Sequence, residues 1–177
     1  MATPSMRSIG EDDIQLLRYW RNLEHVRSAM TTSAVISHQH QRDWYAGQSA
    51  NNARHFVYSI DDVDVGSFNL SKIDFETRSF EGGIYCGNPD YFGHWINLWA
   101  CIQLYEIGFG SLDLETSTAR IITKNYKAIR LNKEIGYTLV GEAENGIGHY
   151  VLTKAAFLSK AKPLKSWLKK FELSQYT

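Results

Sequence analysis

The chain has 177 residues, of which 44% are hydrophobic and 21% charged, a composition typical of one globular domain with a sizeable core. Lysine plus arginine and aspartate plus glutamate both number 19, so the net charge is zero, which argues against broad electrostatic binding to nucleic acid or membrane. Cys86 and Cys101 do not form a metal-binding pattern, and neither a signal peptide nor a run of about 18 apolar residues occurs. We therefore expect a cytoplasmic protein with no disulfide, metal or membrane insertion.

The first quarter of the chain predicts one short strand and three helices. The strand covers residues 6–9, and a helix should follow over residues 11–22, because acidic residues at its start meet the positive end of the helix dipole. Residues 23–30 form a second helical segment. Ser37 is a suitable N-cap for a third helix over residues 38–48.

Trp20-Arg21-Asn22 ends the first predicted helix with a polar pair beside a tryptophan. Arg21 has two interpretations. It is either a solvated residue at a helix end or a substrate contact whose guanidinium forks onto a phosphate or carboxylate.

Three short strands follow, over residues 54–60, 65–70 and 77–86. Short polar turns separate them, which predicts an antiparallel meander. The third strand leads into the stretch around which the rest of the chain is organised.

That stretch continues with a turn over residues 87–90 and then a helix from Gly93. Apolar residues fall on nearly every side of this helix, so we expect it to be buried against a sheet. Free N–H groups and the dipole at its start favour a bound phosphate. The alternative is a plain connection between a strand and a helix.

Residues 114–121, rich in β-branched side chains, predict a further strand. A helix follows over residues 126–134. Asn125 precedes it, and Gly136 is a plausible stop because glycine readily takes the left-handed conformation that ends helices.

The last part of the chain predicts a hairpin and a helix. Strands over residues 137–142 and 149–153 are joined by residues 144–146, whose Asn-Gly pair is a strong hairpin signal. An amphipathic helix covers about residues 160–173, with Pro163 in its first turn. It is a docked helix, a partner helix or a membrane-surface helix. Its apolar stripe is Leu164, Trp167, Leu168 and Phe171.

This order of elements resembles the GNAT superfamily of acetyl-CoA-dependent N-acetyltransferases. The likeness rests on residues 81–85, 88–93 and 125–137 and covers residues 6–154. It implies an α/β (α+β) fold, with a mixed, mostly antiparallel twisted sheet flanked by helices in a single domain over residues 1–177.

The resemblance implies a pyrophosphate cradle over residues 92–97, where Gly93 is kept but Trp95 and Asn97 stand in place of small residues. Either Trp95 points into the core and the backbone N–H groups stay usable, or the cofactor site is altered or lost. The cofactor contacts expected for acetyl-CoA are Ile84, Tyr85, Gly93, His94, Trp95, Ile96, Asn97, Asn125 and Ala128.

Two catalytic residues are expected from the same resemblance. Glu81 stands where many members carry the carboxylate that takes the proton of the substrate amine, and burial would raise its pKa. Its other interpretation is a structural ion pair. Asn132 stands where a tyrosine often protonates the leaving thiolate, and it could hydrogen-bond that group or a water.

The acceptor is expected to be a small molecule, the amine of a UDP- or dTDP-linked amino sugar. Trp20-Arg21-Asn22 looks like the ribosomal-protein and nucleotide-sugar branches of the superfamily, and Arg21 suits a diphosphate. The expected substrate contacts are Trp20, Arg21, Asn22 and Met30. Protein N-terminal acetylation and a degenerate, non-catalytic binding domain are the alternatives, and a homodimer stays open.

Overall fold

The computed structural model describes residues 2–48, 52–143 and 145–174. The elements in chain order are β1 (Pro4–Ser8), η1 (Glu11–Asp13), α1 (Ile14–Asn22), α2 (Glu24–Arg27), α3 (His38–Ala46), β2 (Arg54–Ile60), β3 (Val63–Asp74), β4 (Ser79–Cys86), η2 (Pro89–Tyr91), α4 (Trp95–Tyr105), η3 (Glu106–Ser111), β5 (Thr116–Ile122), α5 (Tyr126–Ile135), β6 (Thr138–Ala143), β7 (Ile147–Thr153) and α6 (Lys154–Ser174).

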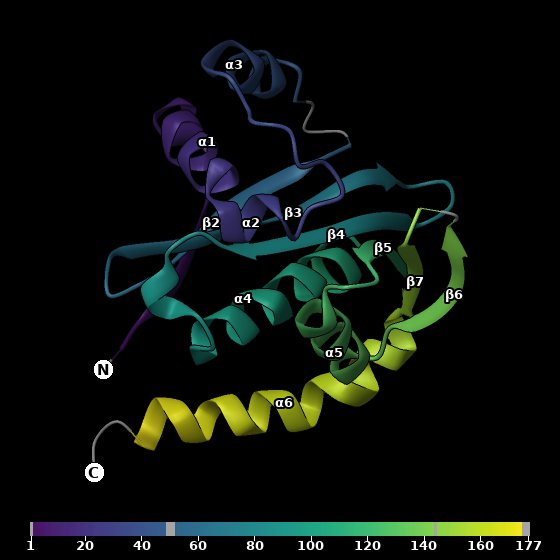
Figure 1. The fold of residues 1–177 in the computed structure, drawn as a ribbon. Coiled ribbons are helices and arrows are strands. Elements are labelled where there is room, and N and C mark those ends of the chain that lie inside the picture. The colour runs from purple at the N-terminus through teal and green to yellow at the C-terminus, as the bar shows by residue number, and fades with distance from the viewer. Residues whose placement is uncertain (1, 49–51, 144, 175–177) are drawn as a thin grey trace.

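The strands form one seven-stranded sheet in the order β1-β2-β3-β4-β5-β7-β6. Every neighbouring pair is antiparallel except β4 and β5. Figure 1 shows α1, α2 and α3 on one face of the sheet and α4, α5 and α6 on the other. The predicted mixed, mostly antiparallel fold is confirmed.

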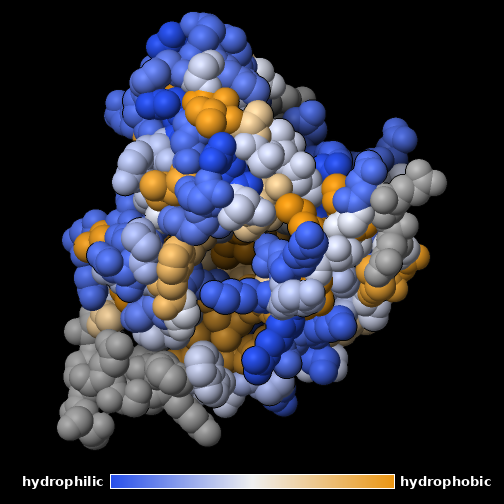
Figure 2. Space-filling view, viewed as in Figure 1, coloured by the Kyte–Doolittle hydropathy of each residue, from blue (hydrophilic) through white to orange (hydrophobic). Residues whose placement is uncertain are grey.

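The main core lies between the sheet and α4. Side chains alternate between the two faces along a strand, and Phe80 of β4 packs against Tyr105 and Phe109 on the α4 side. Its neighbour Glu81 therefore faces the side of the sheet that carries α1 and α2. Figure 2 shows apolar side chains in a recess over α4, between the sheet and α6.

A second, smaller core holds α1 on the opposite face. Leu17, Trp20 and Val57 are buried there, with Tyr85 packed against them. A Cβ on Gly87 would lie 2.2 Å from the Trp20 ring, so the absence of a side chain at residue 87 lets α1 approach the end of β4 closely.

The local signals for α5 are confirmed. Asn125 is the N-cap, with its Oδ1 accepting the N–H of Ala128. Gly136 has a φ of 113° and ends the helix, as left-handed glycines do. The hairpin of β6 and β7 also forms, with Gly146 at a φ of 70°, while residue 144 of the predicted turn lies outside the described residues.

Two helices differ from the prediction. The segment 23–30 is helical only over Glu24–Arg27. The last helix begins at Lys154 because the Thr153 hydroxyl accepts the N–H of Ala156 as a cap, so Pro163 lies inside the helix and not in its first turn.

The last helix docks on the domain by an apolar stripe. Phe157, Ala161 and Leu168 are buried, and Leu164 is half-buried against the main core. Trp167 is 44% exposed, and the side chain of Phe171 lies outside the described residues. Within the described ranges, no helix combines the length and the hydropathy needed to cross a membrane.

Candidate active site

The site begins where β4 and β5 separate. These parallel strands pair only over residues 79–81 and 116–118. Beyond that point the edge of β4 that faces β5 has no strand partner among the described residues, so backbone groups around Ile84 and Tyr85 are available to a ligand. The opening is a consequence of topology, because β4 continues toward α4 while β5 continues toward α5.

The loop from β4 to α4 is held in one conformation by its backbone. Gly93 has a φ of 75°, which favours glycine, and a Cβ there would meet nothing within 4 Å. The N–H groups of Phe92, His94 and Asn97 donate to carbonyls of the loop, and the N–H of Ile96 donates to Nδ1 of His94.

The N–H groups of Gly93 and Trp95 have no acceptor among the described residues. Both lie at the positive end of α4, and a Cβ on Gly93 would enter open space. Free donors and a helix dipole at one point suit an anion such as a pyrophosphate.

Trp95 and Asn97 leave this cradle open. Trp95 is only 5% exposed and belongs to the main core, although its Nε1 has no partner in the described part of the chain. The Asn97 amide donates to the carbonyls of Tyr91 and His94 at 2.7 and 3.1 Å. The first of the two alternatives for Trp95 therefore applies, and the cradle fits the pyrophosphate of acetyl-CoA.

His94 and Ile96 serve the loop itself. His94 caps α4, and burial lowers the pKa of its imidazole. The Ile96 side chain is fully buried. The Ile96 N–H donates its hydrogen bond to His94, so neither the side chain nor the N–H of Ile96 is free to contact a cofactor.

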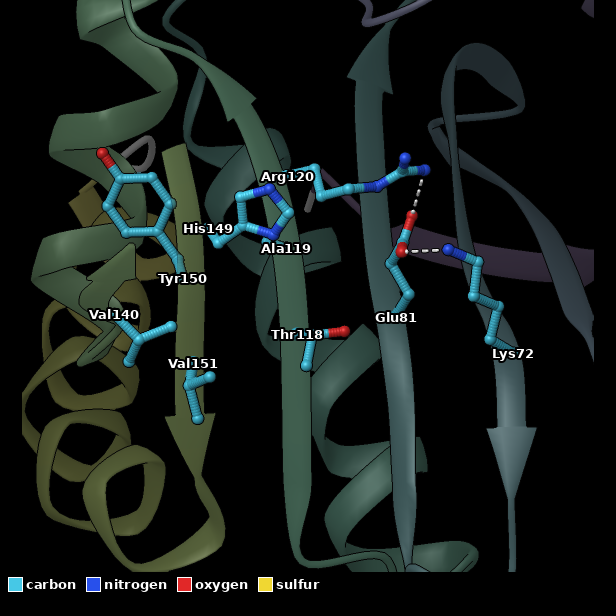
Figure 3. A pocket seen from close by; sticks show the side chains of 9 residues that line it. All are labelled: Lys72, Glu81, Thr118, Ala119, Arg120, Val140, His149, Tyr150 and Val151. Carbon is cyan, nitrogen blue, oxygen red and sulfur yellow. Dashed lines mark hydrogen bonds and ion pairs between the residues drawn. The ribbon is translucent and has the colours of Figure 1, made fainter. Parts of the chain in front are cut away.

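Glu81 carries two ion pairs (Figure 3). Lys72 Nζ lies 2.7 Å from its Oε2, and the Arg120 guanidinium lies 3.3 Å from its Oε1. Burial acts to raise the pKa of Glu81, but the hydrogen bond from Lys72 and the charges of Arg120 and Lys72 outweigh it, so this pKa is lowered. The prediction that burial raises the pKa of Glu81 is wrong, because it took no account of the two cations.

A pocket of about 320 Å³ adjoins Glu81 on the open face of β4, β5 and β7. The residues that line it (Figure 3) are Lys72, Glu81, Thr118, Ala119, Arg120, Val140, His149, Tyr150 and Val151.

Sequence reasoning missed Lys72, Arg120 and His149. They come from three strands whose order in the sheet is not apparent from the chain. One signal was present: Arg120 alternates with the buried Ala119 and Ile121, which places it on the opposite face of β5.

The residues expected to bind the acceptor have separate roles. Trp20 is buried, edge-on to Tyr85 at 6.5 Å. The Asn22 amide exchanges two hydrogen bonds with the backbone of Ile36, at 2.9 and 2.8 Å, and so fixes the loop before α3. Met30 is half-buried in that loop.

Arg21 differs from its neighbours. Its NH1 atom is buried and has no hydrogen-bond partner among the described residues. Burial raises the pKa of the nearby Tyr85 to about 12, while the charge of Arg21 acts to lower it. A buried guanidinium nitrogen without a hydrogen-bond acceptor lowers the stability of the fold, unless a ligand supplies that acceptor.

The asparagines of α5 bond within the helix. Asn125 forms the N-cap described above, and Asn132 Nδ2 donates to the carbonyl of Ala128 at 2.8 Å. Oδ1 of Asn132 has no partner in the described part of the chain.

A family model described as an acetyltransferase (GNAT) domain matches residues 5–138. Acetyltransferase PseH of Campylobacter jejuni is 25% identical over 134 residues, which make up 76% of this chain and 82% of that protein.

Solved structures share the fold. A spermidine N-acetyltransferase from Vibrio cholerae, in complex with CoA and spermine, superposes with a TM-score of 0.79 at 18% identity, covering 88% of this chain and 98% of that one. A domain from Methanocaldococcus jannaschii superposes with a TM-score of 0.75 at 19% identity, covering 86% and 99%.

Proposed function

This chain belongs to the acetyltransferase (GNAT) domain family and is an N-acetyltransferase, and we propose that it acetylates the amino group of a UDP- or dTDP-linked amino sugar with acetyl-CoA. When bound, acetyl-CoA supplies an activated thioester. The remaining chemistry is assigned to residues of this chain.

The proposal that acetyl-CoA is the cosubstrate rests on the loop before α4 and on the separation of β4 from β5. The free N–H groups of Gly93 and Trp95 would hold the pyrophosphate. Successive N–H groups of a strand point to opposite edges, so one of the two N–H groups of Ile84 and Tyr85 faces the edge of β4 left by β5, where it would stabilise negative charge on the thioester oxygen. Asn132 has an Oδ1 without a partner among the described residues, and we assign it to the leaving thiolate or a water.

Glu81 is assigned as the group that takes the proton of the acceptor amine. Its carboxylate lies at the last residue pair before β4 and β5 separate, on the face opposite α4. A lowered pKa keeps it ionised at neutral pH and therefore able to accept a proton.

The unpaired NH1 of Arg21 is the observation that carries the acceptor class. A guanidinium suits a diphosphate through its bidentate fork. Lys72 and Arg120 add positive charge on the same face, which disfavours a polycation such as spermidine. The likeness to acetyltransferase PseH supports the acetyl transfer itself.

Free thiol release tests the acceptor. The protein is incubated with acetyl-CoA and either UDP- and dTDP-linked amino sugars, peptides with free N-termini, or spermidine. We expect turnover with a sugar nucleotide. Arg21→Ala should lose this turnover and still bind acetyl-CoA, as measured by calorimetry. Arg18→Ala, one turn earlier on α1 and bonded to Gln15, is the matched control.

Turnover of peptides alone would replace the sugar-nucleotide proposal with protein N-terminal acetylation. Binding of acetyl-CoA without turnover of any amine would instead support a non-catalytic binding domain.

A further inference from the structure

Lys72 has a backbone conformation that its residue type rarely adopts. It lies in β3 at a shift of register between Ser71 and Asp74, and its φ is 50°, in the left-handed region. Residues 66–71 of β3 pair regularly with β4, and after the irregularity Asp74 pairs with Ser79. Backbone outliers of this kind are enriched at functional sites, where the surrounding structure maintains them.

The left-handed backbone accompanies a side chain directed toward Glu81. Lys72 Nζ reaches Glu81 Oε2 at 2.7 Å, while Arg120 approaches the other carboxylate oxygen from β5 (Figure 3). The Lys72 side chain is 65% exposed and Arg120 is 44% exposed, so both side chains can move away without disturbing the core.

Lys72 Nζ is a primary amine placed against the carboxylate assigned to deprotonate a primary amine. The Lys72–Glu81 pair therefore resembles the pair that an acceptor amine would form with Glu81, with the side chain of Lys72 in place of the acceptor. His149 of β7 lines the same pocket, but its imidazole is not a primary amine.

We propose that Lys72 occupies the acceptor position in the free enzyme and is acetylated by the enzyme itself when acetyl-CoA is bound and no acceptor is present. This inference rests on the proposed function, because it uses the same thioester and the same Glu81. It assigns a modification site and an internal competitor to the acceptor amine.

The reaction is balanced without any other reactant. Lys72 Nζ forms a bond to the acetyl carbonyl carbon, and the bond between that carbon and the CoA sulfur breaks. Because Lys72 Nζ is an ammonium in its ion pair with Glu81, it gives up two protons in all. The first passes to Glu81 before Nζ attacks, and the second, released as the amide forms, protonates the CoA thiolate that leaves. The product side chain is a neutral amide, which loses its ion pair with Glu81 and frees the carboxylate on that side.

Mass spectrometry of the full-length protein tests the proposal. The protein is incubated with acetyl-CoA alone, and the acetylated fraction of Lys72 is followed over time by peptide mapping. Lys160, exposed on α6, reports uncatalysed acetylation in the same sample. We expect Lys72 to react faster than Lys160 by on the order of 10²-fold, the lower end of what a positioned base contributes.

Two variants complete the test. Glu81→Gln should reduce Lys72 acetylation to the level of Lys160, and Lys72→Arg should abolish the excess while retaining a cation beside Glu81. Adding an accepted amine should slow Lys72 acetylation, because both compete for one position.

The decisive preparation is one that binds acetyl-CoA by calorimetry and turns over an acceptor. If Lys72 is acetylated no faster than Lys160 in that preparation, this inference is overturned and the proposed function stands. A failure to bind acetyl-CoA would overturn both. Fast acetylation of Lys72 that persists in Glu81→Gln would overturn the assignment of its proton to Glu81.

Discussion

The Tyr58 hydroxyl of β2 donates a hydrogen bond of 2.7 Å to Oδ1 of Asn97, in the first turn of α4. Tyr58 is fully buried, and the Asn97 amide in turn holds the carbonyls of Tyr91 and His94. One side chain thus joins the sheet, the loop and the helix start. Asn97 therefore fixes the loop in which we propose that the pyrophosphate binds.

Asn97→Ala should weaken both folding and cofactor binding. It removes these hydrogen bonds and leaves the Tyr58 hydroxyl with the weaker partners Cys86 and the Tyr85 carbonyl, the latter at 3.3 Å. We expect the free energy of unfolding, measured in urea, to fall by about 1–3 kcal/mol. Acetyl-CoA affinity, measured by calorimetry, should fall as the loop loses its fixed conformation.

Tyr58→Phe is the control, because it removes the bond to the sheet and keeps the two bonds to the loop. Equal acetyl-CoA affinity in Asn97→Ala and wild type would mean that the loop is fixed by other contacts.

Gly93→Val should abolish acetyl-CoA binding while the protein still folds. The new Cβ would enter the open space in front of the free N–H groups, where we place the pyrophosphate. The φ of 75° is strained for valine, so a moderate loss of stability is expected as well. Calorimetry and thermal unfolding measure the two effects separately.

Gly10→Val is a matched substitution, since a Cβ at Gly10 also meets nothing within 4 Å and its φ is −120°. Unchanged acetyl-CoA affinity in Gly93→Val would place the cradle elsewhere.

Glu81→Gln should lower the rate of acetyl transfer by on the order of 10² to 10⁴, the usual contribution of a positioned base. Acetyl-CoA affinity should stay nearly unchanged, because Glu81 faces away from α4. Since Lys72 and Arg120 help to lower its pKa, the wild-type rate should show no loss from Glu81 protonation down to about pH 5. Wild-type turnover by the glutamine variant would remove Glu81 from the mechanism.

His55 should make folding stability depend on pH. Its ring hydrogen-bonds Gln48 Oε1 at 2.8 Å and lies edge-on to Trp44, and burial lowers its pKa from 6.5 to about 4. The unfolded chain therefore binds a proton that the folded chain excludes between these values, so stability falls as pH drops from 6.5 toward 4. We expect a loss of about 2 kcal/mol after allowance for partial exposure.

Urea unfolding at a series of pH values measures this dependence. His55→Gln should flatten the slope, whereas His38→Gln, at an exposed position on α3, should leave it unchanged. A slope that persists in His55→Gln would assign the effect to other groups.

Local chemistry along the chain determined most of the elements. The caps of α5 at Asn125 and Gly136, the turn at Gly146 and the alternation along β2, β3 and β4 act over a few residues, so they can be interpreted without knowing what packs where. The start of α6 was missed because the Thr153 cap is a weaker local signal than Pro163.

The sequence by itself therefore determined the order of elements, the fold class and the family resemblance. Only the tertiary structure decided the protonation of Glu81, because its partners Lys72 and Arg120 are 9 and 39 residues away in sequence and meet it through strand pairing. Likewise, the burial of Trp95 and the bond from Tyr58 to Asn97 depend on α4 docking beneath the sheet. Hydrophobic packing sets those contacts, and no local periodicity encodes them.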